Sequence, residues 1–145
     1  MEDKYNLQRF VKAQQQDFSA AYMEVSLGRK RSHWMWYVFP QITGLGMTST
    51  SQYYSIKSAE EAKAYMEHPY LGENMRRICK ALLSLQENDP HKIFGTPDDL
   101  KLCSSMTLFA RTVPEEPLFQ QVLEQYYDGR RDERTIEILK RMMDK

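Results

Sequence analysis

Prolines stand at the start of several helical patterns in this sequence and divide it into short helices. After His68-Pro69 the apolar residues recur every three or four positions, which is the spacing of one face of an α-helix. A capping residue is followed by a proline in the same way at Asp89-Pro90 and at Thr96-Pro97. Proline is tolerated in the first turn of a helix and breaks its interior. These positions therefore predict helix starts that are separated by short connections.

Helical spacing of apolar residues continues over nearly the whole chain. The longest pattern, which we expect to form a central helix from Pro69, contains Leu71, Met75, Ile78, Cys79, Leu82 and Leu85. Residues 33–39 form an unbroken apolar run, for which we favour a short buried helix because no second strand-like run exists to pair with it. Asp17 is expected to start one helix and Gly28 to end it. The other predicted helices cover residues 7–16, 17–27, 58–68, 100–113, 118–129 and 136–143, with short helical turns near 48–56 and 90–95.

Length and composition predict one domain. The chain has 145 residues, of which 41% are hydrophobic and 28% are charged, as in an ordinary globular domain. We therefore predict an all-α fold, a compact single-domain bundle of about seven or eight short helices over residues 1–145, without significant sheet. Twenty basic and twenty acidic residues give zero net charge, so we expect no membrane partner and no sequence-specific nucleic-acid partner.

The two cysteines indicate a compartment and exclude some chemistry. Cys79 and Cys103 are too few for a secreted disulfide framework, and neither they nor the three histidines have the spacing of a zinc site. The start of the chain does not resemble a signal peptide, and no apolar stretch approaches the ~20 residues that span a bilayer. We expect a cytoplasmic protein without a metal or a cofactor, since no phosphate-loop or dinucleotide glycine pattern occurs. Both cysteines fall on apolar helix faces and are expected to stay reduced and non-catalytic.

Acidic residues avoid two stretches of the chain. None occurs in the 35 positions between Glu24 and Glu60, where the average composition would place about five, and none occurs in residues 100–114. Both stretches set basic and hydroxyl side chains among apolar ones, as in many sites for anionic ligands. We therefore predict that they meet and form one electropositive pocket for an anionic small molecule, such as a nucleotide or a phosphorylated metabolite. The residues predicted to line it are Arg29, Lys30, Arg31, Ser32, His33, Trp36, Gln41, Lys101, Ser104, Ser105 and Thr107.

Each of these features also has a structural interpretation. The basic residues 29–31 fit cations placed beyond the C-terminal end of a helix, where they interact favourably with its dipole. His33 and the tryptophans fit core residues, and the hydroxyl side chains fit groups bonded to helix carbonyls. A second functional hypothesis is a helical interaction module that binds a protein partner. Its partly exposed patch would consist of Trp34, Trp36, Tyr53 and Tyr54.

Several longer motifs resemble one bacterial protein family. They are Arg9-Phe10 with Ala13-Gln14, the run from Gly28 to Trp36, Phe39-Pro40-Gln41, Gly44-Leu45-Gly46, His68-Pro69 with Leu71-Gly72, Phe94-Gly95, and Lys101-Leu102 with the run from Ser104 to Phe109. Together they resemble the family called domain of unknown function 1810, over nearly the whole chain. The resemblance implies a mainly α-helical single domain, with helix rather than strand at residues 33–39. It implies no activity, because the family is uncharacterised.

Overall fold

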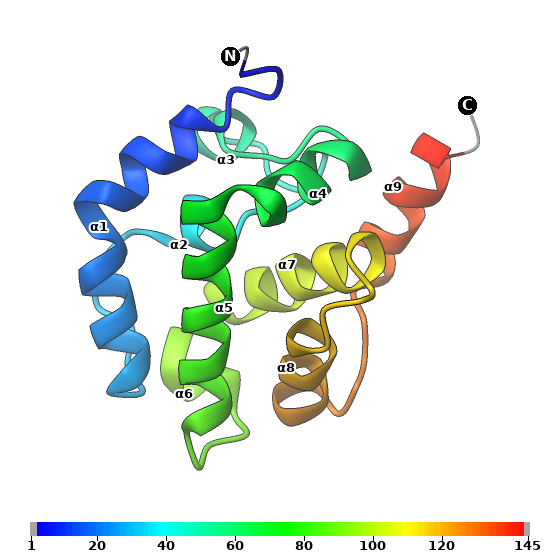
Figure 1. Ribbon diagram of the computed structural model, residues 1–145. Helices are drawn as coiled ribbons and strands as arrows, with labels where there is room; N and C mark the ends of the chain where they lie inside the picture. The colour runs from blue at the N-terminus through cyan, green and yellow to red at the C-terminus, as the bar shows by residue number, and fades with distance from the viewer. Residues whose placement is uncertain (1–2, 144–145) are drawn as a thin grey trace.

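The computed structural model describes residues 3–143 and is built from helices (Figure 1). Within these residues the chain forms nine helices: α1 (Gln8–Ser26), α2 (Met35–Val38), α3 (Ser49–Tyr53), α4 (Ala59–Glu67), α5 (Pro69–Ser84), α6 (Pro90–Phe94), α7 (Asp98–Thr112), α8 (Leu118–Tyr127) and α9 (Glu133–Met143). The described part of the chain contains no strand, and one parallel bridge joins Ile42 to Ile56. The predicted all-helical class is therefore confirmed. The predicted count of seven or eight is too low, because the short α3 and α6 both form complete helices.

α1 continues through the break that the sequence predicts at Asp17. This residue lies inside the helix, and its carboxylate accepts a hydrogen bond from the Tyr37 hydroxyl instead of starting a second helix. Gly28 ends the helix as predicted, with a φ of +79° that favours glycine. The Gly28 N–H donates to the Val25 carbonyl, and the Arg29 N–H donates to the Glu24 carbonyl. These two hydrogen bonds reverse the direction of the chain, so that the next segment turns back onto the end of α1.

α5 lies at the centre of the bundle, as the length of its apolar stripe predicts. It packs against α1, α4 and α8, and Figure 1 shows it between α1 on one side and α7 and α8 on the other. His68 caps its start, because its Nδ1 accepts hydrogen bonds from the N–H groups of Tyr70 and Leu71. Gly72 allows α4 to approach closely, since a Cβ at this position would lie 2.1 Å from the Met66 carbonyl oxygen.

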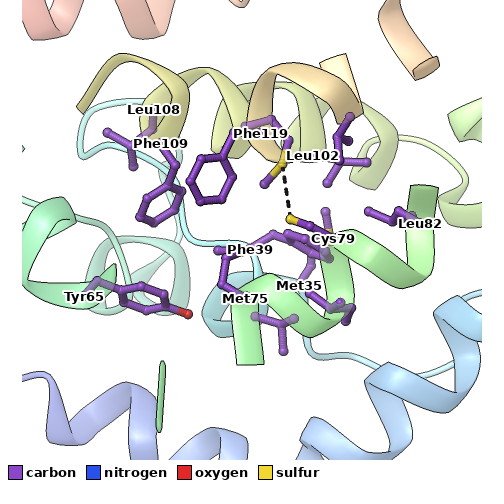
Figure 2. Packing of buried hydrophobic residues seen from close by; sticks show 14 of the residues in the cluster. Met35, Phe39, Tyr65, Met75, Cys79, Leu82, Leu102, Leu108, Phe109 and Phe119 are labelled. Carbon is purple, nitrogen blue, oxygen red and sulfur yellow. Dashed lines mark hydrogen bonds between the residues drawn. The ribbon is translucent and has the colours of Figure 1, made fainter. Parts of the chain in front are cut away.

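One hydrophobic cluster fills the space between the long helices (Figure 2). Leu82 and Cys79 of α5 are fully buried in it, together with Met106 of α7. The Cys79 thiol lies 3.9 Å from the Met106 sulfur, and burial raises the pKa of this thiol. In the described part of the chain, no helix combines the length and the apolar character that crossing a membrane requires.

A buried polar network fixes α2 to the rest of the fold. The side-chain amide of Gln14 in α1 donates to the Tyr37 carbonyl and to the Tyr65 hydroxyl, both at 2.8 Å. The same amide accepts a hydrogen bond of 3.0 Å from Asn74 in α5. Buried polar groups need partners, so this network holds α2 in one position against α1, α4 and α5. The helix that carries Trp36 is therefore rigidly placed.

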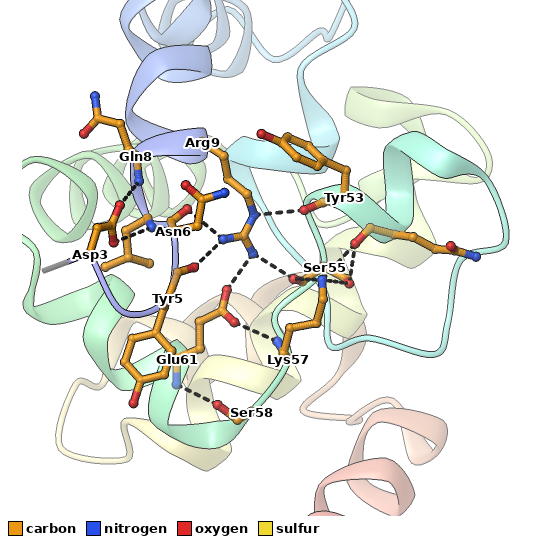
Figure 3. Close-up of polar contacts among 12 residues, drawn as sticks. Asp3, Tyr5, Asn6, Gln8, Arg9, Tyr53, Ser55, Lys57, Ser58 and Glu61 are labelled. Carbon is orange, nitrogen blue, oxygen red and sulfur yellow. Dashed lines mark hydrogen bonds and ion pairs between the residues drawn. The ribbon is translucent and has the colours of Figure 1, made fainter.

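A second buried network is centred on Arg9 (Figure 3). Its guanidinium donates to the Glu61 carboxylate at 2.6 Å, and the two side chains are only 5% and 2% exposed. The guanidinium donates four more hydrogen bonds to backbone carbonyls, which are those of Tyr5, Asn6, Tyr53 and Ser55. Arg9 therefore joins the start of α1 to the connection between α3 and α4.

Candidate functional site

A cavity of about 440 Å³ lies where the loop after α2 meets the first turns of α7 and α9. Residues from three distant parts of the sequence line it. Four of the residues predicted from the sequence are among them, namely Trp36, Gln41, Lys101 and Ser104. Lining residues that the sequence analysis did not predict include Leu45, Met47, Leu100, Asp132 and Arg134. These four predicted residues of the cavity lining come from both acid-free stretches.

The loop after α2 is held in place by backbone bonds around the Ile42–Ile56 bridge. The Ile56 N–H donates to the Gln41 carbonyl and the Thr43 N–H donates to the Ile56 carbonyl, both at 2.8 Å. Gly46 then passes close to α3, since a Cβ there would lie 2.4 Å from the Ser51 hydroxyl oxygen. Because the loop is closed at its base, Gln41 and the residues that follow it form a defined wall of the cavity.

Lys101 and Ser104, one turn apart on α7, form another part of the cavity lining. The Lys101 ammonium lies 5.5 Å from the centre of the Trp36 ring, a cation–π distance. It also lies 3.6 Å from the Asp98 carboxylate, and its side chain is 26% exposed. This separation from Asp98 is longer than a hydrogen bond, so Lys101 is loosely held on that side.

Asp132 is the acidic residue of the cavity lining, and three hydrogen bonds engage one of its oxygens. Oδ2 accepts from the Ser104 hydroxyl at 3.1 Å, from the Thr135 N–H at 3.2 Å and from the Thr135 hydroxyl at 2.5 Å. Because Asp132 directly precedes α9, its bond to the Thr135 N–H caps this helix. The carboxylate therefore has a structural role at the start of the helix that carries Arg134.

The basic segment at residues 29–33 does not line the cavity. It is folded around Glu24, whose carboxylate accepts hydrogen bonds from the Arg31 N–H at 2.7 Å, the Ser32 N–H at 2.9 Å and the Ser32 hydroxyl at 2.6 Å. The Trp34 indole N–H donates to the same carboxylate at 3.0 Å. Burial raises the pKa of Glu24, but these hydrogen bonds outweigh it and lower the pKa to about 2. The structure therefore does not bring residues 29–33 to the cavity that Lys101 lines.

Within this segment, the side chain of Lys30 is the one that reaches α7. Its ammonium lies 2.8 Å from the Asp98 carboxylate, and its side chain is only 9% exposed. Arg29, Arg31 and His33 are exposed at the surface. The basic segment at residues 29–33 thus approaches the second acid-free stretch through the Asp98 carboxylate, which lies between Lys30 and Lys101. Trp36, farther along the first stretch, lies directly beside Lys101.

Ser105 and Thr107, also predicted for the site, lie inside the fold. Ser105 is fully buried, and its hydroxyl has no hydrogen-bond partner among the described residues. The Thr107 hydroxyl donates to the Cys103 carbonyl and accepts from the Asp132 N–H, both at 2.8 Å. Thr107 therefore anchors the start of α9 onto α7, and its bond to the Cys103 carbonyl agrees with the structural interpretation, whereas the Ser105 hydroxyl makes no such bond.

Arg134 and Asp132 belong to the cavity, and no sequence pattern predicted either of them there. The spacing from Asp132 to Thr135 before an apolar run is a helix-start signal, which locates α9 but not its neighbours. Arg134 reaches the cavity because α9 packs against α7. That contact joins residues about thirty positions apart, and no local pattern encodes it.

A larger cavity of about 710 Å³ adjoins the Arg9 network. Two of its basic groups are already engaged, since all of the donors of Arg9 are used and the Lys57 ammonium donates to the carbonyls of Gln52 and Ser55 at 2.9 Å each. The Lys4 ammonium, which also belongs to the lining, lies 5.5 Å from the centre of the Tyr5 ring. Burial, and secondarily the charge of Arg9, lower the pKa of Lys57. This cavity is therefore a poorer candidate for ligand binding than the one beside Trp36. Among residues 3–143, no cluster of three or more histidine, cysteine or acidic side chains is arranged to hold a metal ion.

Comparison with known proteins finds the family that the motifs indicate. Residues 4–139 match the family described as protein of unknown function (DUF1810). The fold is similar to the crystal structure of the conserved hypothetical protein Rv1873 from Mycobacterium tuberculosis, with a TM-score of 0.93, 45% sequence identity, and coverage of 95% of this chain and 99% of that chain. Comparison with curated proteins gives no match. The resemblance seen in the motifs is confirmed, and the chain belongs to the DUF1810 family.

Proposed function

We propose that the cavity beside Trp36 binds an anionic small molecule, such as a nucleotide or a phosphorylated metabolite. The observation that carries this proposal is that Trp36, Lys101 and Arg134, from three distant parts of the sequence, share one cavity of about 440 Å³. A volume of this size is typical of small-molecule sites. The combination of an aromatic ring with two cations fits a ligand that has both a flat apolar part and a negative charge.

Charge favours an anion at this site. Lys101 and Arg134 are basic, and Asp132 is the acidic lining residue. One oxygen of Asp132 accepts three hydrogen bonds from the protein, so part of its negative charge is already compensated. Within the described residues, Arg134 forms no ion pair with an acidic side chain. Its guanidinium is therefore available to a phosphate or a carboxylate, which it can bind through two parallel hydrogen bonds.

The rest of the lining favours a ligand with an apolar, planar part. Trp36 is only partly buried, and Met47 and Leu100, which also line the cavity, are 86% and 63% exposed. Stacking of a base on an aromatic side chain contributes roughly 1 to 3 kcal/mol. Gln41 adds an amide that can both donate and accept hydrogen bonds at the edge of such a ring.

The same surroundings favour binding over nucleophilic catalysis. The Ser104 hydroxyl lies within hydrogen-bond distance of the Leu100 carbonyl and of the Asp132 carboxylate. The Thr135 hydroxyl donates to the same carboxylate oxygen, so this carboxylate is not a strong base directed at Ser104. Burial, and secondarily the charge of Asp132, raise the pKa of Cys103 to about 11, which disfavours its thiolate. Both cysteines are free, which fits the reducing cytoplasm that we propose as the compartment.

The interaction-module hypothesis receives less support. Its patch requires four partly exposed aromatic side chains, and Trp34 is fully buried. Trp34 instead packs beside Phe39 and Phe94, with ring centres 6.2 and 6.4 Å away. Of the remaining aromatics, Trp36 lines the cavity beside Lys101 and Tyr53 lines the larger cavity, while the Tyr54 ring lies 4.9 Å from that of Tyr53. We therefore favour the small-molecule site.

The proposal is tested by titration with adenosine monophosphate and with inorganic phosphate, followed by calorimetry and by tryptophan fluorescence. Lys101→Gln and Arg134→Gln should each weaken binding by roughly 1.5 to 3 kcal/mol, or about ten- to a hundredfold in Kd, and added salt should weaken it further. The matched control is Lys80→Gln, an exposed lysine on α5, which contributes nothing to the cavity wall. Trp36→Phe should abolish any fluorescence quenching by the nucleotide. Absence of binding by both probes at millimolar concentration would refute the proposal.

A further inference from the structure

Asp98 lies between two lysines at the edge of the cavity. Its Oδ2 is 2.8 Å from the Lys30 ammonium, and its Oδ1 is 3.6 Å from the Lys101 ammonium. Asp98 is not part of the cavity lining, whereas Lys101 is. One negative charge is therefore shared by two positive ones, and the more distant of the two faces the proposed ligand.

The two lysines are held very differently. The Lys30 ammonium lies 5.3 Å from the centre of the buried Trp34 ring, and the Lys30 N–H donates to the Ile93 carbonyl at 2.7 Å. Trp34 is itself fixed by its bond to Glu24. Lys101 is more exposed, and its contact with Asp98 exceeds hydrogen-bond length. Both lysines lie over a tryptophan ring, so the difference lies in Asp98: Lys30 is its close and buried partner, and Lys101 is its more distant and more exposed one.

We infer that Lys30 is a positioning residue for the proposed anion site, although it contacts no ligand: by engaging Asp98, it leaves Lys101 free to turn to the anion. This inference rests on the proposed function of the cavity. An anion that enters the cavity takes Lys101 from Asp98, and Asp98 keeps a full ion pair with Lys30. Without the charge of Lys30, the Asp98 carboxylate would have Lys101 as its only cationic partner and would hold it more strongly. The same carboxylate would repel the anion, so both effects would weaken anion binding.

This inference assigns separate roles to neighbouring cations in the sequence. Arg29 and Arg31 are exposed and flank Lys30, so replacing either one removes the same charge at almost the same place. A general effect of net charge would make all three residues equivalent. A positioning role makes Lys30 alone important, and it makes the effect of Lys30 depend on Asp98.

The experiment measures the affinity for adenosine monophosphate and for inorganic phosphate by calorimetry, in the full chain. Lys30→Met keeps the apolar stem that packs near Trp34 and removes the charge. It should weaken binding by roughly tenfold. Lys30→Arg should bind as the wild type does, and the matched control Arg31→Met should change Kd by less than about twofold. Circular dichroism of each variant verifies that the fold is kept.

The double variant Lys30→Met/Asp98→Asn decides between positioning and a merely structural ion pair. If Asp98 competes for Lys101, neutralising it restores the affinity to within about twofold of the wild type, and Asp98→Asn alone binds at least as tightly as the wild type. If the double variant binds as weakly as Lys30→Met, the inference is overturned. It is also overturned, with the cavity proposal intact, if Lys101→Gln weakens binding and Lys30→Met does not. Failure of the wild type to bind either probe overturns both.

Discussion

Neutralising Glu61 tests how strongly the Arg9 network holds the N-terminal half of the fold. Arg9 has five N–H donors, and all five are used: four bind backbone carbonyls and the fifth binds Glu61. The second oxygen of Glu61 accepts from the Lys57 N–H at 3.0 Å. Glu61→Gln preserves the shape of the side chain and can keep the bond to Lys57. It then turns an amide NH₂ towards the buried guanidinium, where a negative charge was.

The expected cost follows from the burial of this pair. Removing one partner of a buried ion pair costs roughly 3 to 5 kcal/mol, because the other charge stays buried without compensation. We expect about 3 kcal/mol for Glu61→Gln, the lower end of this range, since four carbonyl dipoles still surround the guanidinium. The matched control is Glu137→Gln. Glu137 pairs with Arg141 at 4.0 Å with side chains 68% and 76% exposed, so its loss should cost less than about 0.5 kcal/mol.

The double variant Arg9→Met/Glu61→Leu separates the ion pair from the other bonds of Arg9. Each single variant leaves a charge buried, whereas the double variant leaves none. Its loss of stability should therefore be smaller than the sum of the losses of Arg9→Met and Glu61→Leu, by at least about 1 kcal/mol.

Urea unfolding followed by circular dichroism measures these differences directly, because a domain of this size is stable by roughly 5 to 15 kcal/mol. Equal costs of Glu61→Gln and Glu137→Gln, within about 0.5 kcal/mol, would contradict the strong contribution expected of the buried ion pair. Strict additivity of the two single variants would equally show that Arg9 and Glu61 do not act as a pair.

Three further predictions concern other parts of the fold. Leu82→Ala should lower the free energy of unfolding by roughly 2 to 5 kcal/mol, because Leu82 is fully buried. In the same urea assay, Leu27→Ala should change it by less than about 0.5 kcal/mol, because the Leu27 side chain is 77% exposed. Glu24 has a pKa lowered from 4.5 to about 2, so its ionised form stabilises the fold above pH 4.5 and this contribution is lost as the pH falls towards 2. Glu24→Gln should therefore be less stable than the wild type at pH 7, and the gap should close near pH 2; a constant gap in acid unfolding would contradict this. Cys79 and Cys103 should react with a thiol reagent at neutral pH only after unfolding, because burial raises the pKa of both, and rapid labelling of the native protein would be the opposite result.

Local signals predicted the helix boundaries well where the capping group is close in sequence. His68 bonds to N–H groups two and three residues ahead, and Asp89 bonds to the N–H of His91, so both helix starts are encoded locally. The predicted helix start at Asp17 is wrong because the partner of Asp17 is distant in sequence. Its side chain is engaged by Tyr37, twenty residues away, and no pattern around Asp17 distinguishes this tertiary contact from a cap.

The candidate site was predictable in part, because stretches that set basic and polar side chains among apolar ones are typical of ligand sites. Trp36, Gln41, Lys101 and Ser104 were found in this way. Arg134 was not, since it reaches the cavity only through the packing of α9 against α7. Helix-to-helix packing of this kind depends on the whole arrangement of the bundle and is not encoded in the residues around one position.

The acid-free stretches also show why charge counted along a chain overstates the local field. The first stretch begins just after Glu24 and the second just after Asp98 and Asp99, each near a helix end, and in the fold one acid contacts the stretch that it precedes. Glu24 stands before the first stretch, and the reversal at Gly28 brings residues 31–34 back onto its carboxylate. Asp98 stands before the second, and as the first residue of α7 it faces Lys101 one turn later. Asp98 then binds Lys30 as well, so a single carboxylate compensates part of both stretches. The positive charges at the cavity proposed as the ligand site therefore come from Lys101 and Arg134 and not from the longest run of basic residues.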